Sequence, residues 1–366
     1  MQEDFHYYAT YCAALLSGYS HKDSLDICYS AQFVDLCSKT LLTRIHAPAN
    51  AATTQLQLEM MDARTDILGL QDITRIWASF HFLPRDLYAA KEKRTKRYMN
   101  KFRLICGPNG DLLEKTVRLA KGSSLQHTGI AMHVLADTWA HTYFAGTPSL
   151  VINNTDWDFF EIITENGIET ERRVKFRHSP SSPDDLEKGI YTNSLYQGDE
   201  NSIMNLGHGR AGHFPDYSFA RYRYVPAWDD YKQVIKDNPS DYVKAFTQMI
   251  YAMKFLNGSI DEFEKDRYDT SVMDKYGDRI KQIITKRQLL ASDDWKSFGE
   301  ELSGETIEAF DIHKYQDEYI KTSKKEETFI GKFIKGATLQ KGMVTEEISR
   351  SKNNLAGFSM ITHQIT

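Results

Sequence analysis

The stretch GSSLQHTGIAMHVLADTWAHTYFAG, residues 122–146, decides how this chain folds. Within it, His133, Asp137 and His141 stand four residues apart. A step of four residues advances an α-helix by about 400°, so successive side chains drift by only roughly 40° and stay on one face. We therefore expect a helix that directs two imidazoles and a carboxylate into the same space.

This expected helix has suitable ends and little polar surface. Ser123 or Ser124 is a suitable N-cap, and Gly146 suits the position just beyond the last turn. Its other residues are apolar on almost every side: Ile130, Val134, Leu135, Trp139 and Phe144. Such a helix is typically central and buried. Its three polar groups then need partners, because an unpaired buried charge is very costly. A divalent metal ion would supply one, and a hydrogen-bonded core network is the alternative; three ligand-type side chains in register favour the ion.

The composition is that of an ordinary globular protein, with 41% hydrophobic and 26% charged residues in a chain of 366. The net charge of −5 gives no electrostatic reason to expect nucleic acid or an anionic membrane as partner. The first residues lack the basic start of a secretory signal, and no apolar run reaches the ~18 residues of a membrane span. The cysteines form no CxxC pair, which favours buried thiols in a reducing compartment. We expect a cytoplasmic protein without a transmembrane segment.

The N-terminal third predicts further helices that carry possible ligands. Residues 1–45 have the spacing of a helical hairpin broken at Gly18, with His6 at the head of the first helix. Asp35 ends the apolar segment AQFVD of the second helix, where it is either a bound carboxylate or a surface residue near the helix end. Residues 59–83 fit a helix but end in FHFLP, which alternates like a short extended piece and contains His81.

The second half of the chain changes character twice. Residues 151–200 contain two β-rich runs joined at Glu165-Asn166-Gly167, a hairpin signal, and we interpret them as an insertion into a helical protein. Residues 205–230 have loop composition and hold His208, His213 and Asp216 among glycines, a set suited to cation coordination or, alternatively, to exposed polar positions. The aromatic residues that follow either pack in the core or line a substrate cleft.

The expected organisation is therefore a mainly α-helical bundle with a small β-hairpin insertion. A helical metal-binding domain covers residues 1–260, including the insertion at about 151–200. A helix over 239–260 closes it. Residues 261–366 are charged and helical, and we expect a C-terminal helical extension.

Nine side chains with nitrogen or oxygen donors lie among apolar or glycine-rich neighbours: His6, Asp35, His81, His133, Asp137, His141, His208, His213 and Asp216. Nine donors are too many for one tetrahedral zinc, but they suit two or three hydrolytic ions with bridging carboxylates. The donor types suit zinc and also admit iron, manganese or nickel. Asp35 and Asp137 are candidate catalytic residues, and Arg210 is a candidate for steadying phosphoryl oxygens.

The order of these residues resembles that of the zinc-dependent phospholipases C and the fungal single-strand nucleases. Those families carry an early His, an Asp on the next helix, a further His, and then HxxxD on a central helix followed by more His. The matching positions here are His6, Asp35, His81, and His133 with Asp137. The resemblance implies a mostly helical fold, a cluster of two or three zinc ions, and hydrolysis of a small-molecule or lipid phosphate ester by a metal-activated water.

Some features differ from that pattern. Asp137 and His141 are closer together than in those families, and a His-x4-His with Asp216 replaces the later HxxxE. Those families also use a processed N-terminal amine as a ligand; this sequence starts at Met1, and Asp4 is the candidate substitute. Over roughly residues 1–260, the segments DFHYYATYCAALLSGYS, AQFVD, FHFLP, HVLADTWAHTYFAG and GHGRAGHFPD more closely resemble a family of uncharacterised bacterial proteins with no known activity.

Three functions therefore remain open from the sequence. The first is a metal-dependent hydrolase of phosphate esters. The second is a non-catalytic protein in which the same ions only hold helices together. The third is a metal-free binding module whose histidines and aspartates form internal hydrogen bonds.

Overall fold

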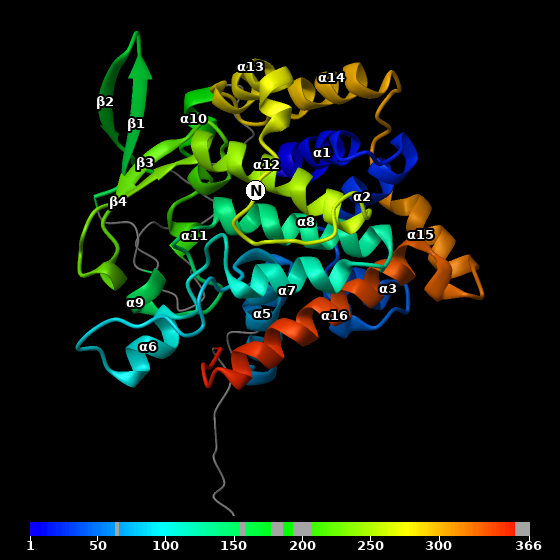
Figure 1. Ribbon diagram of the computed structural model, residues 1–366. Coiled ribbons are helices and arrows are strands. Elements are labelled where there is room, and N and C mark those ends of the chain that lie inside the picture. Colours follow the sequence, from blue (N-terminus) through cyan, green and yellow to red (C-terminus); the bar gives the residue numbers. More distant parts are fainter. Residues whose placement is uncertain (63–65, 154–157, 177–185, 193–206, 356–366) are drawn as a thin grey trace, which may run out of the picture.

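The computed structural model describes residues 1–62, 66–153, 158–176, 186–192 and 207–355. The protein is mainly helical with one small sheet, as expected (Figure 1). Helix α8 (Leu125–Ala140) lies in the middle of the helical part, and nearly all of its residues are buried. Four helices pack against it: α2 (His21–Phe33), α7 (Asp111–Ala120), α12 (Asn238–Leu256) and α16 (Phe329–Arg350).

The remaining described helices are short or lie further from α8. The α-helices are α1 (Thr10–Leu16), α3 (Lys39–Arg44), α4 (Gln57–Asp62), α5 (Ile67–Ile76), α6 (Lys96–Phe102), α9 (Leu150–Asn153), α10 (Leu186–Ile190), α11 (Gly207–Arg210), α13 (Ser271–Thr285), α14 (Ser292–Ser303) and α15 (Ile312–Lys321). The 3-10 turns are η2 (Ala49–Ala51), η4 (Phe214–Asp216), η5 (Ala227–Asp229) and η6 (Lys325–Glu327). None of the helices in the described ranges is long and apolar enough to cross a membrane.

The ends of α8 agree only in part with the sequence analysis. The hydroxyl of Ser124 caps the first turn by accepting from the backbone N–H of His127. The helix ends at Ala140, with His141 as its C-cap residue, so the prediction that Gly146 follows the last turn is wrong. Gly146 instead lies against the backbone of Trp77, where an added Cβ would come within 2.8 Å of its carbonyl carbon.

Helices α2 and α8 pack unusually closely. A Cβ on Gly129 would lie 2.3 Å from the carbonyl oxygen of Ile27, so only glycine fits there. The hydroxyl of Ser30 donates to the carbonyl of Gln126 across the same contact, at 2.6 Å. This close approach brings the C-terminal half of α2 within hydrogen-bonding distance of the side chains of α8.

Two short π-helical segments carry predicted ligands. The first, η1 (Asp4–Ala9), contains His6 and runs into α1. The second, η3 (Trp77–His81), continues α5 and ends at His81, which replaces the expected extended piece. A π-helical turn holds one more residue than an α-helical turn, and such turns are frequent at functional sites. The helical hairpin expected over residues 1–45 is confirmed, with Gly18 at φ 96° in the break.

The sheet contains the predicted hairpin and two further strands. Strands β1 (Phe160–Glu165) and β2 (Ile168–Arg173) pair antiparallel around a two-residue turn whose residues both have positive φ. Strands β3 (Arg221–Tyr224) and β4 (Val234–Asp237) extend the sheet in the order β2-β1-β3-β4. The sequence analysis missed both and expected only a hairpin. Part of the predicted insertion, residues 154–157, 177–185 and 193–200, lies outside the described ranges.

The aromatic residues after Asp216 contribute to a second core beneath this sheet. Tyr222 and Tyr224 are buried and stack near Phe159. We therefore assign these two tyrosines to packing, which was one of the two expectations for them.

The C-terminal part packs against the core of residues 1–260. Helix α16 contacts α8 and buries Phe333, Ala337 and Val344 in the same core cluster that contains α8. The backbone N–H of Ala291 donates to the carboxylate of Asp4 at the other end of the chain. The division at residue 260 remains a prediction, and the contacts across it are extensive.

Candidate metal centre

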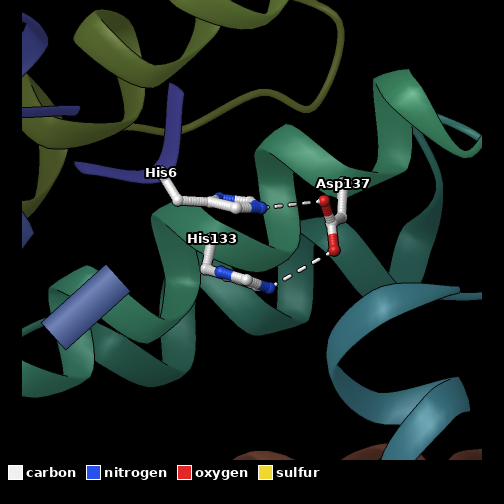
Figure 2. Close-up of side chains that lie close together, drawn as sticks. All are labelled: His6, His133 and Asp137. Carbon is white, nitrogen blue, oxygen red and sulfur yellow. Dashed lines mark ion pairs between the residues drawn. The ribbon is translucent and has the colours of Figure 1, made fainter. Parts of the chain in front are cut away.

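The carboxylate of Asp137 lies at the edge of two stacked imidazoles. His133 stands one turn earlier on α8, and His6 enters from η1, with ring centroids 3.7 Å apart and nearly parallel planes. As Figure 2 shows, each ring faces a different carboxylate oxygen: His6 Nε2 lies 3.1 Å from Oδ1, and His133 Nε2 lies 3.3 Å from Oδ2. All three side chains are buried. The other ring nitrogen of His6, Nδ1, has no hydrogen-bond partner among the described residues.

A second group shares His133 and opens toward solvent. His81 Nδ1 lies 3.3 Å from Asp137 Oδ2 and 3.9 Å from Asp35 Oδ1. His133 Nε2 also lies 3.9 Å from Asp35 Oδ1. The Asp35 side chain is 33% exposed, whereas the side chains of His133 and Asp137 are closed to solvent. The turn after α2 therefore presents Asp35 at the edge of the cluster.

A third group lies beyond Asp137, at the end of α8. His141 Nε2 and His208 Nε2 lie 3.1 and 3.2 Å from the same oxygen of Asp216. His208 comes from α11 and Asp216 from η4. Taken together, the three groups are His6–His133–Asp137, Asp35–His81–His133 and His141–His208–Asp216, each with donor atoms within 4.8 Å of one another.

The backbone nitrogen of Met1 connects the central group to the third. It lies 2.6 Å from Asp137 Oδ1, 3.2 Å from Asp216 Oδ1 and 3.3 Å from His141 Nε2, fully buried. Burial alone would lower the pKa of this amine, but Asp137 and Asp216 raise it to about 11. Asp4, the suggested substitute for an amine ligand, instead accepts a hydrogen bond from the N–H of Ala291.

Backbone carbonyls fix which nitrogen of three histidines carries the proton. A carbonyl can only accept, so His133 Nδ1 donates to Ala31, His81 Nε2 to Thr53, and His141 Nδ1 to the carbonyl of His81. In the neutral ring the other nitrogen then has a free lone pair. These lone pairs all face the carboxylates of the cluster. Metal-ligating histidines are typically oriented in this way.

The charges of the cluster favour neutral His6 and His141 beside ionised carboxylates. His81 differs: burial would lower its pKa, but the hydrogen bond to Asp137 and the charge of Asp35 raise it. Burial lowers the pKa of both His6 and His141 to about 4. Burial would raise the pKa of Asp137, but His141, the Met1 amine and His133 together hold it well below its usual range. Asp216 is held low in the same way, chiefly by His208 and the amine. The cluster therefore brings ionised carboxylates, the Met1 ammonium and nitrogen lone pairs together in one buried space.

Eight of the nine predicted ligands meet in these groups. His213 lies beside them, its Nδ1 4.0 Å from Asp216 Oδ2, with a side chain that is 44% exposed. Arg210 is buried on α11. The sequence analysis did not identify the carbonyls of Ala31 and Thr53, because backbone acceptors leave no trace in residue types.

A family profile matches residues 1–348 of the chain. The chain belongs to the DUF6765 family, a family of unknown function. The predicted membership of an uncharacterised family is thus confirmed, over more of the chain than the sequence motifs covered. No curated protein matches the chain, and no solved structure does. The comparisons therefore do not support the resemblance to phospholipases C and single-strand nucleases, which remains a prediction.

Proposed function

We propose that this DUF6765 protein is a metal-dependent hydrolase of phosphate esters, with two or three divalent ions and zinc as the first candidate. One observation carries the proposal. Nε2 of His133 and Nδ1 of His81 both point at Asp137 Oδ2 from 3.3 Å. In a buried space, two ring nitrogens and a carboxylate oxygen at this distance repel one another unless a proton or a cation lies between the nitrogens and the oxygen.

A cation explains the cluster better than protons do. Protonation would have to charge several neighbouring rings, and burial lowers the pKa of His6 and His141 to about 4. At neutral pH both rings are neutral, and because His141 Nδ1 donates to the carbonyl of His81, its Nε2 has no proton to offer Asp216. The three groups would hold the ions, with His133 shared between the first two. His/Asp donor sets of this kind suit zinc and related transition metals.

The reaction class follows from the number of ions and the access to them. Neighbouring divalent ions supply an activated water and neutralise charge on phosphoryl oxygens. Asp35 and His208 keep the two outer groups partly exposed, whereas the central group is closed. A substrate therefore contacts the two outer groups, and Asp137 lies between these groups. The order of the ligands along the chain, which resembles that of the phospholipases and nucleases, supports a small-molecule or lipid phosphate ester as substrate.

Elemental analysis and a substrate screen test this proposal together. We expect at least two equivalents of zinc or another transition metal after purification or reconstitution, and hydrolysis of a phosphodiester or phosphomonoester in a generic panel. Asp137→Asn should lose most of the metal and the activity. The matched control is Asp293→Asn at an exposed position of α14, which should change neither. Less than one equivalent of metal, with none taken up on reconstitution, would refute the proposal.

The closed central group favours one alternative. His6, His133 and Asp137 are all buried, so an ion held there would have little access to substrate and would act as a staple between η1 and α8. If the loaded protein hydrolyses no ester while Asp137→Asn lowers its melting temperature, the whole cluster is such a staple and the hydrolase proposal is wrong.

A further inference from the structure

The last described helix reaches the wall of the cluster with two adjacent residues. Gln340 of α16 is completely buried, and its Nε2 donates to the carbonyl of Ser79 at 3.1 Å and to the hydroxyl of Thr116 at 2.9 Å. Ser79 belongs to η3, two residues before His81. The amide of Gln340 therefore holds the backbone that carries this histidine.

Packing alone gives no reason for an amide at this position. The Oε1 atom of Gln340 is buried and has no hydrogen-bond partner among the described residues. Leaving such a buried acceptor unsatisfied destabilises the folded protein. An apolar side chain of similar length would avoid that cost. We therefore attribute the amide at this position to the two hydrogen bonds that its Nε2 donates.

Lys341 holds the loop whose next residue contacts the same histidine. Its ammonium donates to the carbonyls of Asn50 and Ala52, at 2.7 and 2.5 Å, and lies over the ring of Phe80. The next residue, Thr53, offers the carbonyl that accepts from His81 Nε2.

Thr53 also ties this loop to the turn that bears Asp35. Its hydroxyl donates to the carbonyl of Val34 at 2.7 Å, and its N–H donates to the carbonyl of Cys37 at 2.9 Å. The loop held by Lys341 thus contacts both His81 and the residues on either side of Asp35. Those are the two ligands that the open group adds to His133.

We propose that Gln340 and Lys341 are positioning residues that hold His81 and Asp35 in the geometry of the open ion site. The inference rests on the metal cluster of the proposed function, but not on its reaction. Removing the partner that orients a ligating histidine typically weakens metal binding by about 10–100-fold. The two residues act on one ion of the set, because neither has a described contact with the His141–His208–Asp216 group.

The test compares Lys341→Met and Gln340→Met with Lys332→Met, an exposed lysine of the same helix. Zinc is titrated against a competing chromophoric chelator. We expect one ion to bind about 10–100-fold more weakly in the first two variants, with the other ions unchanged. Lys332→Met should match the wild type, and Lys341→Arg, which retains donors for both carbonyls, should restore most of the affinity. Wild-type zinc affinities in Lys341→Met and Gln340→Met would overturn the inference.

A second measurement needs neither bound metal nor activity. In the metal-free protein with 15N-labelled histidine, the His81 resonances, assigned with His81→Gln, should report a ring protonated at Nε2. In Lys341→Met this preference should give way to a mixture of tautomers, while His133 keeps its own. An unchanged His81 spectrum would contradict the inference. A wild type that binds zinc but hydrolyses nothing would instead refute only the proposed function.

Discussion

Asp137 is the residue on which the centre converges. One of its oxygens faces His6 and the Met1 amine, and the other faces His81 and His133. The i, i+4 spacing on α8 was sufficient to predict that Asp137 and His133 share a face. It could not show that His6 stacks on His133, because that contact depends on how η1 lies against α8. Residue types and spacing thus identified the residues that meet in the cluster, while their pairing required the tertiary structure.

His127 gives a prediction about pH. It is buried on α8 beside Gly336, and burial, with a smaller effect of Lys335, lowers its pKa to about 4. Between this value and the ordinary pKa of about 6.5, the unfolded chain binds a proton that the folded protein does not. Stability should therefore fall as the pH drops from about 6.5 to 4, with up to about 3 kcal/mol from this one ring.

Urea unfolding at pH 7 and pH 5 measures the effect. The loss of unfolding free energy between the two pH values should be smaller in His127→Gln than in the wild type. The exposed His313→Gln should show the full wild-type loss. An equal pH dependence in all three proteins would mean that His127 is protonated in the folded state.

At the scale of elements, the contact between α2 and α8 determines the position of His133. Its Nδ1 donates to the carbonyl of Ala31, which requires the two helices to approach as closely as Gly129 allows. We expect Gly129→Ala to destabilise the protein by about 1–3 kcal/mol, because the added methyl must push the helices apart. It should also weaken zinc binding by moving Ala31 away from the ring.

Gly342→Ala on α16 is the matched control. A Cβ there meets nothing within 4 Å, and alanine is the better helix former, so this variant should be as stable as the wild type or up to about 1 kcal/mol more stable. Thermal unfolding and zinc titration of both variants make the comparison. If Gly129→Ala behaves like Gly342→Ala, the close helix contact does not support the site.

Elements with strong local signals could be predicted, and those set by tertiary contacts could not. Asn166 and Gly167 form the expected turn, because such a turn requires positive φ at both of its central positions and few residue pairs other than Asn-Gly adopt it readily. Strands β3 and β4 span only four residues each and take their conformation from pairing with β1 and with each other. The π-helical turns at His6 and His81 also escaped prediction, because the hydrophobic spacing that marks a helix does not distinguish them from α-helical turns.

For the whole molecule, the cluster joins segments that are far apart in the chain. Ligands come from η1, the turn after α2, η3, α8, α11 and η4. Ions bound only by the folded state stabilise it by RT ln(1 + [ion]/Kd), or about 2.7 kcal/mol at a free concentration of 100 Kd. We therefore expect a chelator to lower the melting temperature and added zinc to restore it.

Calorimetry with and without chelator checks this expectation. Asp137→Asn should show a smaller loss of melting temperature with chelator than the wild type. If the wild type also shows no shift, the cluster is a metal-free hydrogen-bond network. That result would support the third function left open by the sequence, a binding module without ions.

The role of α16 was beyond sequence analysis, because Gln340 and Lys341 are ordinary residues in a charged helical stretch. Their partners Ser79 and Ala52 lie 261 and 289 residues away in the chain. This separation has a consequence for biogenesis. At about 5–20 residues per second, a ribosome needs roughly 6–25 s to pass from Asp216, the last ligand, to Lys341. Throughout that interval a nascent chain has all its donors but lacks the helix that aligns the open group, so we expect full metal loading to follow translation.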